Sequence, residues 1–162
     1  MIERKCSCEM GMHRAPLERY IIESGAVNRL PELLKDYNKV YMVCDENTYR
    51  VLGERAEQIL KSVGKFSHKH ILKGDVLPDA RNIGDVLIHL NDPKADSDIF
   101  KYSPLPDFIL AVGSGVVNDV CRVVSYRLGL PYGIAGTAPS MDGYASAGSP
   151  TLFDGTKATI KC

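Results

Sequence analysis

FILAVGSGVVNDV, residues 108–120, is the stretch of sequence that decides the fold. Its first part, Phe108–Val112, is an unbroken apolar run, which predicts a central parallel strand covered on both faces. The run leads directly into the Gly-Ser-Gly sequence at 113–115, and apolar residues at helical spacing then continue to Leu128, where Gly129 ends the predicted helix. The stretch therefore predicts a buried strand that turns abruptly into a helix.

The glycine turn between that strand and that helix is a candidate phosphate site. Glycine permits a tight turn and a close backbone approach, while the unpaired amides and positive dipole end of the helix attract a phosphate. The full dinucleotide fingerprint would need a third glycine where Asn118 stands. Because such turns also occur for packing alone, the alternative is that Ser114 caps the helix, with Asn118 and Asp119 as ordinary first-turn residues. The candidate pyrophosphate-binding residues are Gly113, Ser114, Gly115, Val116, Val117, Asn118 and Asp119.

Short β-type runs alternate with helical patterns on both sides of this stretch. Further strands are predicted at 39–44, 65–72 and 132–135, and helices are predicted from a cap at Asn28 through Leu34, over 46–62, and from Asp79 to Leu90. Asp154-Gly155 between alternating runs is a hairpin signal. The pattern predicts an α/β fold, Rossmann-like and doubly wound, with a mainly parallel sheet and a C-terminal β-hairpin.

Asp45 is a candidate ribose-binding residue because it follows the predicted strand at 39–44 directly. A carboxylate at the carboxyl end of a parallel strand can accept hydrogen bonds from both hydroxyls of an adenosine ribose. Asp45 is equally suited to capping the helix that begins at Glu46, and the two geometries are compatible. A free carboxylate at the ribose would disfavour a 2′-phosphate.

The segment Gly136–Pro150 follows the last predicted strand and is rich in small, polar and turn-forming residues. Open α/β sheets bind ligands at such positions, with hydroxyls and backbone amides facing the cleft. Asp142 is the only carboxylate in this segment. A turn-stabilising role is the ordinary expectation for an isolated Asp-Gly pair.

Composition excludes several classes of protein. The 162 residues contain 20 Lys and Arg against 20 Asp and Glu, a balance that argues against a nucleic-acid or membrane-surface partner. No apolar run approaches the roughly 20 residues that span a bilayer. The N-terminal residues contain acids and lack an apolar core, so they do not resemble a signal peptide. We therefore expect a soluble, cytoplasmic protein.

Cysteine and histidine residues are expected to be structural. The five cysteines include no C-x-x-C pair, which indicates free thiols, with Cys44 and Cys121 as small core residues. Cys6, Cys8 and His13 offer three metal ligands, whereas a structural zinc site needs four, so a loosely ordered N-terminus is the favoured interpretation. The remaining histidines are expected to be packed or solvated: His68, His70 and His89.

AVGSGVVNDVCRVVSYRLGLPYGIAGTAPSMDGYASAG, residues 111–148, resembles the nucleotide-binding core of the sn-glycerol-1-phosphate dehydrogenase family, within the iron-containing alcohol dehydrogenase and dehydroquinate synthase-like superfamily. VCDENTYRVLGE at 43–54 and DVLIHL at 85–90 also fit. The resemblance extends from about Tyr20 onward. It implies an N-terminal tail at 1–19 and an NAD(P)-binding domain at 20–162.

Members of that family are NAD(P)-dependent and reduce dihydroxyacetone phosphate to sn-glycerol 1-phosphate with a bound divalent metal, zinc or nickel. The resemblance implies that Gly115–Asp119 contact the cofactor pyrophosphate, that Asp45 meets the ribose and that Asp142 touches the substrate. Further cofactor-lining residues implied in the same way are Thr137, Ala138, Pro139, Ser140 and Ser146.

The family's metal is held by one Asp and two His of a helical C-terminal domain that this chain lacks, so we expect no metal site and no turnover by this chain alone. None of its histidines matches a ligand position. Loss of the partner domain exposes apolar surface, which favours a homo-oligomer. The alternatives are a polyol (glycerol) dehydrogenase, a dehydroquinate synthase-like domain, or a stand-alone nucleotide-binding module.

Overall fold

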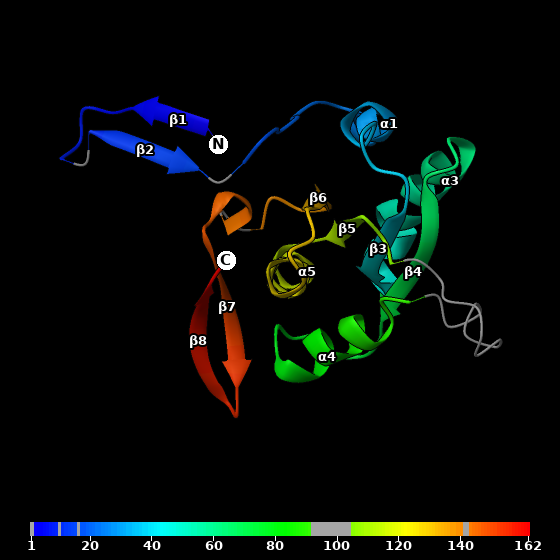
Figure 1. The fold of residues 1–162 in the computed structure, drawn as a ribbon. Coiled ribbons are helices and arrows are strands. Elements are labelled where there is room, and N and C mark those ends of the chain that lie inside the picture. The colour runs from blue at the N-terminus through cyan, green and yellow to red at the C-terminus, as the bar shows by residue number, and fades with distance from the viewer. Residues whose placement is uncertain (1, 10, 16, 92–104, 141–142) are drawn as a thin grey trace.

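A computed structural model describes residues 2–9, 11–15, 17–91, 105–140 and 143–162 of the chain. At its centre four parallel strands pair in the order β4-β3-β5-β6 (Figure 1). Their bounds are β3 Val40–Asp45, β4 Phe66–Leu72, β5 Phe108–Gly113 and β6 Tyr132–Gly136. β3 and β5 are the two central strands, and the apolar residues of both are almost wholly excluded from solvent. The expected central parallel strand at 108–112 is thereby confirmed.

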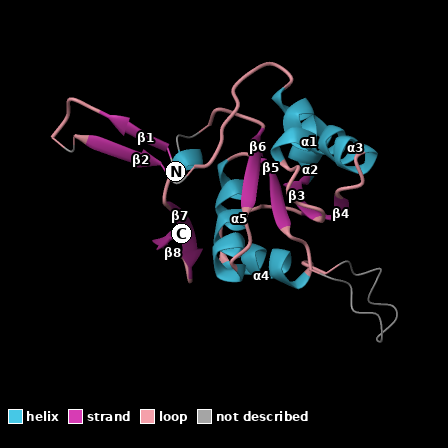
Figure 2. Ribbon diagram, turned by 45° about the horizontal axis from the view of Figure 1, so that its top comes forward, coloured by secondary structure: helices cyan, strands magenta, loops and turns pink. Residues whose placement is uncertain are grey.

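Helices cover both faces of this sheet (Figure 2). One face packs against α1 (Leu30–Leu33) and α3 (Glu54–Ser62), and the other packs against α4 (Ala80–Ile88) and α5 (Gly115–Leu128). Alternate residues of β3 divide between these two cores, because neighbouring side chains of a strand point to opposite faces. The doubly wound α/β fold is confirmed.

Two local expectations for the helices were wrong. Instead of one α-helix over 46–62, the chain forms α2 (Glu46–Thr48), a π-helical segment η2 (Tyr49–Gly53) and then α3. Asn28 does not cap a helix: it lies inside the 3-10 helix η1 (Ala26–Arg29), which begins after Gly25 at φ 76. The Asn28 side chain accepts a hydrogen bond from Arg55 Nη2 at 3.0 Å, so a contact distant in sequence replaces the local cap.

The predicted C-terminal hairpin is confirmed as β7 (Gly148–Phe153) and β8 (Thr156–Lys161), which pair antiparallel. Asp154 and Gly155 both have positive φ, 47° and 77°, as a two-residue hairpin turn of type I′ requires. The hairpin packs beside α4 and α5 instead of joining the main sheet (Figure 1). A backbone hydrogen bond from Leu152 N to Pro78 O, 2.8 Å long, connects it to the segment before α4.

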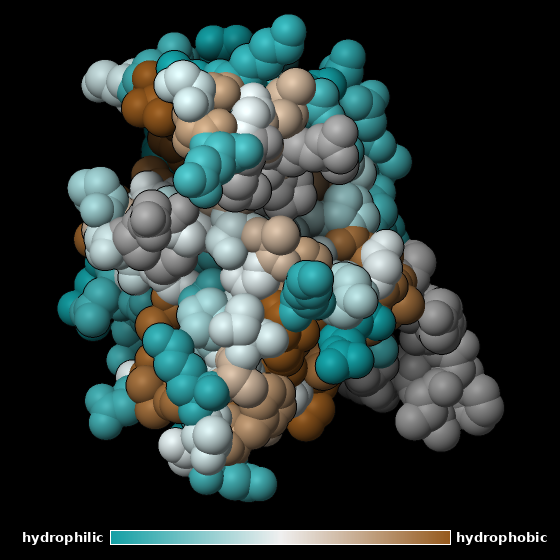
Figure 3. Space-filling view, turned by 90° about the vertical axis from the view of Figure 1, so that its left-hand side faces the viewer, coloured by the Kyte–Doolittle hydropathy of each residue, from teal (hydrophilic) through white to brown (hydrophobic). Residues whose placement is uncertain are grey.

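The N-terminus is more ordered than the sequence indicated. β1 (Ile2–Lys5) and β2 (Met12–Ala15) form an antiparallel hairpin, whose connection includes Gly11 at φ 67. Neither strand has the apolar alternation that reveals a strand in sequence, so the expectation of a loosely ordered tail was wrong for these residues. Viewed from the side on which both hairpins lie, hydrophobic residues occupy separate patches among hydrophilic ones (Figure 3).

Cys44 and Cys121 are buried in the core, as expected, with no exposed area. Burial raises the pKa of Cys44 to about 12, and burial likewise raises the pKa of Cys121. Both thiols therefore remain protonated at neutral pH. Protonated, inaccessible thiols are poor nucleophiles and poor metal ligands.

Glu57 on α3 anchors a charged cluster against β4, and we expect it to stabilise the fold in a pH-dependent way. Its carboxylate lies 2.6 Å from the ammonium groups of both Lys61 and Lys69 and accepts a hydrogen bond from Tyr49 Oη at 2.9 Å. Burial alone would raise the pKa of Glu57, but these hydrogen bonds outweigh it and lower the pKa to about 2. Because Lys61 is more than half exposed, solvent screening reduces the contribution to about 1–2 kcal/mol.

A carboxyl group whose pKa is lower in the folded state stabilises above its unfolded pKa, and that stabilisation disappears as the pH falls toward the folded value. Glu57→Gln should therefore lower the free energy of unfolding at pH 7 by about 1–2 kcal/mol, and the difference from wild type should shrink as the pH falls from about 5 to about 3. Urea unfolding across this range measures it. Glu54→Gln, an exposed position in the same helix, is the matched control and should change stability by less than about 0.5 kcal/mol.

Candidate cofactor-binding site

The candidate site lies where the strand order of the sheet reverses. From β3 the chain crosses to β4 on one side, whereas from β5 it crosses to β6 on the other, so the carboxyl ends of β3 and β5 form a topological switch point. Open α/β sheets bind ligands in the crevice at such a point. The pairing of Cys44 with Val112 places the next residues, Asp45 and Gly113, side by side at this edge.

The glycine turn ends β5 and begins α5. Ser114 is the residue before the helix, and the first helical hydrogen bond runs from Asn118 N to Ser114 O at 3.0 Å. The amides of residues 115–117 therefore precede the regular hydrogen bonding of α5 and point out of its N-terminus. The Ser114 side chain forms no capping hydrogen bond. These amides and the positive helix end are suited to a pyrophosphate.

Packing also requires the glycine at 113. A Cβ atom added there would lie 2.7 Å from Cβ of Val117, closer than side-chain carbons approach one another. Gly113 thus lets the first turn of α5 pack directly on the end of β5, which is one function of glycine in dinucleotide-binding turns. Both interpretations that the sequence allowed, close packing and an anion site, are compatible in this geometry.

Asn118 and Asp119 are both buried, unlike ordinary first-turn residues. Asn118 Nδ2 donates to Asp119 Oδ1 over 3.3 Å, while Asn118 Oδ1 is buried without a hydrogen-bond partner among the described residues. Burial raises the pKa of Asp119, with the nearby Arg122 and Asn118 opposing the rise. A buried acceptor without a partner is uncommon and is a position that a bound donor would satisfy.

Asp45 caps α2, and its carboxylate keeps one oxygen available. Oδ1 accepts from the backbone amides of Asn47 and Thr48, both at 2.8 Å, while the Asp45 amide donates to Thr48 Oγ1 at 3.0 Å. This reciprocal pair is a capping box. Both bonds to the carboxylate use the same oxygen, so Oδ2 remains available at the switch point. The capping interpretation is confirmed, and it leaves room for the ribose interpretation.

The segment after β6 lies beside the glycine turn. The amide of Thr137 donates to the carbonyl of Gly113 at 3.0 Å, and the carbonyl of Ala138 accepts from Tyr144 Oη at 2.8 Å. Ser146 uses its hydroxyl locally, donating to Gly148 O at 3.0 Å and accepting from Gly148 N at 3.2 Å. Pro139 and Ser140, which come directly after Ala138, are exposed. Asp142 lies outside the described residues.

Arg122 is a residue of this region that sequence reasoning missed. It is 4% exposed, and its guanidinium donates to Tyr132 Oη at 2.6 Å. It also donates to three backbone carbonyls at 2.9–3.0 Å, those of Gly143, Tyr144 and Gly148. Arg122 therefore joins α5 to the end of the segment that follows β6. The available signal was a basic residue within the apolar helix sequence VCRVV.

The chain belongs to the iron-containing alcohol dehydrogenase family, whose model matches residues 21–162. Within the family it is similar to glycerol-1-phosphate dehydrogenase (NAD(P)+) of Halalkalibacterium halodurans, with 35% identity over 95% of this chain and 38% of that protein. The same enzyme of Bacillus subtilis is 34% identical over 90% of this chain and 35% of its own length. The chain thus spans well under half of these relatives.

Solved structures support the fold. The glycerol dehydrogenase of Schizosaccharomyces pombe superposes with a TM-score of 0.66 at 17% identity, covering 85% of this chain and 32% of that one. An archaeal alcohol dehydrogenase from a Red Sea brine pool superposes with a TM-score of 0.67 at 16% identity, covering 93% and 42%. The expected family and fold are confirmed.

Proposed function

We propose that the chain is the NAD(P)-binding domain of a metal-dependent oxidoreductase that reduces dihydroxyacetone phosphate to sn-glycerol 1-phosphate. The observation that carries the proposal is the adjacency of the glycine turn and Asp45 at the switch point of the sheet. The names of the most similar relatives support the substrate, since they are glycerol-1-phosphate dehydrogenases that use NAD(P)+.

Different residues at the switch point bind different parts of the cofactor. The amides of Gly115–Val117 bind the pyrophosphate, and Asp45 Oδ2 accepts from the adenosine ribose. Thr137–Ser140 and Ser146 line the nicotinamide side, and Asp142 contacts the substrate. These contacts hold the nicotinamide in one orientation against the substrate carbonyl, which is the contribution that a protein makes to hydride transfer.

The catalytic metal does not fit the residues at this edge. Among the described residues, the one group of His, Cys, Asp and Glu with metal-ligand spacing lies elsewhere, on β4 and α4. We therefore assign the catalytic metal, zinc or nickel, to ligands outside these 162 residues. The 162-residue chain alone should bind cofactor without turnover.

Two enzyme alternatives share the same cofactor site. A 3-dehydroquinate synthase of Staphylococcus carnosus is 30% identical over 65% of this chain, and glycerol dehydrogenases share the fold. A stand-alone nucleotide-binding module is the non-enzymatic alternative. The reading frame beyond codon 162 distinguishes this module from the enzymes, because a stand-alone module requires a stop codon there.

We also propose that the protein is cytoplasmic and that it self-associates. Free thiols at Cys44 and Cys121 suit a reducing compartment. Among the described residues, no helix has the length and apolar character needed to cross a membrane. Light scattering of the purified chain tests self-association, and a strictly monomeric species at high concentration would contradict it.

The substitution Asp45→Asn distinguishes the proposed role of Asp45 in ribose binding from its role as a helix cap. Asparagine caps helices as well as aspartate, so the free energy of unfolding should change by less than about 0.5 kcal/mol. Loss of a charged hydrogen-bond acceptor should weaken NADH binding about tenfold. Removal of the negative charge should weaken NADPH binding less, so the ratio of the two affinities should shift toward NADPH.

Isothermal titration of NADH and NADPH into the folded chain makes this measurement. Glu46→Gln, which removes an exposed charge one residue further on, is the matched control and should leave both affinities unchanged. Absence of binding at millimolar cofactor would contradict the proposed domain. Equal affinities of wild type and Asp45→Asn would contradict the ribose assignment alone.

A further inference from the structure

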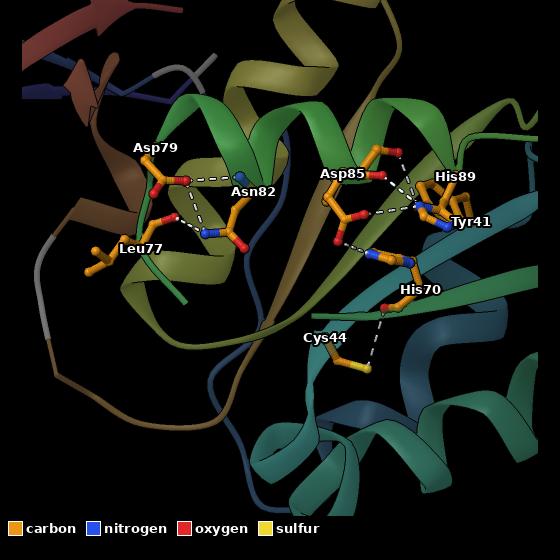
Figure 4. A network of polar contacts seen from close by, with 9 residues as sticks. Tyr41, Cys44, His70, Leu77, Asp79, Asn82, Asp85 and His89 are labelled. Atoms are coloured by element: carbon orange, nitrogen blue, oxygen red, sulfur yellow. Dashed lines mark hydrogen bonds and ion pairs between the residues drawn. The ribbon is translucent and has the colours of Figure 1, made fainter. Parts of the chain in front are cut away.

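We propose that His70, Asp85 and His89 form a binding site for a divalent transition metal, separate from the catalytic metal of the family. His70 lies on β4, while Asp85 and the residue that follows α4, His89, are one helical turn apart. One ligand atom from each of the three side chains lies within 4.8 Å of the others. Figure 4 shows the Asp85 carboxylate facing the two imidazole rings, with a dashed contact to each.

The distances in this cluster are close to those of a coordination shell. His70 Nε2 lies 2.8 Å from Asp85 Oδ2, and His89 Nδ1 lies 3.2 Å from Asp85 Oδ1. Ligand atoms around a tetrahedral zinc ion, with bonds of about 2.0 Å, are about 3.3 Å apart. The two rings stack with centroids 4.3 Å apart, so both nitrogens approach the carboxylate from one side. A metal would replace the hydrogen between His70 Nε2 and Asp85 Oδ2. His89 Nδ1 also lies 2.9 Å from the main-chain carbonyl of Asp85, a contact that it would exchange for the ion.

The donor set selects the class of metal. Two imidazoles and one carboxylate suit zinc, cobalt or nickel, whereas magnesium and calcium prefer oxygen ligands alone. Three protein ligands leave a fourth position to water. The carboxylate and the His89 ring are 42% and 39% exposed, so an ion can reach them from solvent.

Contacts from β3 and β4 fix α4 and the residue that follows it against the sheet. Tyr41 Oη lies 3.2 Å from the Val86 carbonyl, and His68 Nε2 lies 2.9 Å from the His89 carbonyl. His70 itself is only 12% exposed. The ligands are therefore held on packed parts of the sheet and helix, which suits a preorganised metal site.

The position of the cluster gives the metal a structural role. β4 is an edge strand and is separated from β5, with its glycine turn, by β3. A metal held by residues of β4 and α4 would cross-link the edge strand to the helix that covers it. Because it would bind the folded chain and not the unfolded one, it would raise the melting temperature.

Metal titration of the untagged chain tests the site. The background variant Cys6→Ser/Cys8→Ser/His13→Ala removes the other candidate ligands and should still bind one cobalt(II) ion. Its visible absorption should be that of a tetrahedral site, without the thiolate charge-transfer band that cysteine ligands produce. Zinc chloride should compete with cobalt and should raise the melting temperature. Three further variants carry one ligand substitution each in this background: Asp85→Asn, His70→Ala or His89→Ala. Each should bind cobalt at least about tenfold more weakly than the background protein.

Asp79→Asn is the matched control for Asp85→Asn, because it removes the same charge at the N-cap of the same helix and asparagine keeps that cap. It should leave cobalt affinity unchanged. The proposal is overturned if folded background protein binds no cobalt at millimolar concentration. It is also overturned if Asp85→Asn and His89→Ala bind cobalt as tightly as the background. NADH affinity, measured on the same variants, should remain unchanged and tests the cofactor site separately.

Discussion

Replacing Arg122 by methionine should lower the free energy of unfolding by about 3 kcal/mol. The methionine would fill part of the volume of the arginine stem but donate no hydrogen bond. The carbonyls of Gly143 and Tyr144 and the hydroxyl of Tyr132 would then lose their donor, in partly buried surroundings where water replaces it poorly. The carbonyl of Gly148 would keep its hydrogen bond from Ser146 Oγ. Each unpaired buried group costs about 1 kcal/mol or more. Urea unfolding measures the loss.

The same substitution should weaken NADH binding, because Arg122 holds the end of the segment that we propose to line the cofactor. Arg122→Lys should recover only part of the stability, since an ammonium group cannot reproduce the planar fork that reaches several carbonyls at once. Arg127→Met, at an exposed position of the same helix, is the matched control and should change stability by less than about 0.5 kcal/mol. Equal losses in Arg122→Met and Arg127→Met would show that the buried hydrogen bonds contribute nothing.

Gly113→Ala should destabilise the domain by about 1–3 kcal/mol and weaken cofactor binding, because the new methyl group would lie against Val117. To relieve the contact, either the valine or the first turn of α5 must move. Displacement of that turn would also move the amides that we propose to bind the pyrophosphate. Urea unfolding and titration with NADH measure the two consequences.

A double-mutant cycle with Val117→Ala tests the cause. Val117→Ala alone leaves a small cavity, but in the Gly113→Ala background it also removes the two γ-methyl groups, so that of the three close carbons only Cβ remains. The double mutant should therefore be more stable than the sum of the two single effects predicts, by about 0.5–1 kcal/mol. Strict additivity would show that the γ-methyl groups of Val117 do not cause the loss.

Local patterns in the sequence were enough to predict the elements that define this fold. The apolar run Phe108–Val112 is typical of a strand buried on both faces, and Asp154-Gly155 has the chemistry of a tight hairpin turn. Asp45 was predicted to lie at the end of a strand, and the capping box there depends only on neighbouring residues. In each case the interactions that decide the structure are close along the chain.

Features that depend on distant partners could not be predicted in this way. Arg122 is buried because carbonyls more than twenty residues further along the chain surround its guanidinium. Asn28 bonds to Arg55 instead of capping a helix. The histidines of β4 and α4 gave no sequence signal of their grouping, because only the packing of α4 on β4 brings them together.

The assignments that rest on a ligand remain predictions. The roles of Asp45, Gly113–Asp119, Thr137–Ser140 and Ser146 at the cofactor are proposed from placement at the switch point and from family membership. The boundary between a tail at 1–19 and a domain at 20–162 is a prediction as well. NADH titration of Asp45→Asn and Gly113→Ala tests two of these positions.

The strand order has a consequence for how the chain folds. β3 lies in the middle of the sheet, yet one of its two partners, β5, is made only after the whole of α3, β4 and α4. Sheets built from such distant pairings form late, because the intervening chain must first be ordered. During synthesis, β3 could pair with β4 on one side, but its other side would have no partner strand until β5 emerges. The strand that covers this flank of β3 also carries the glycine turn, so the centre of the sheet and that turn would be ordered in the same folding step, before β6 is added at the edge.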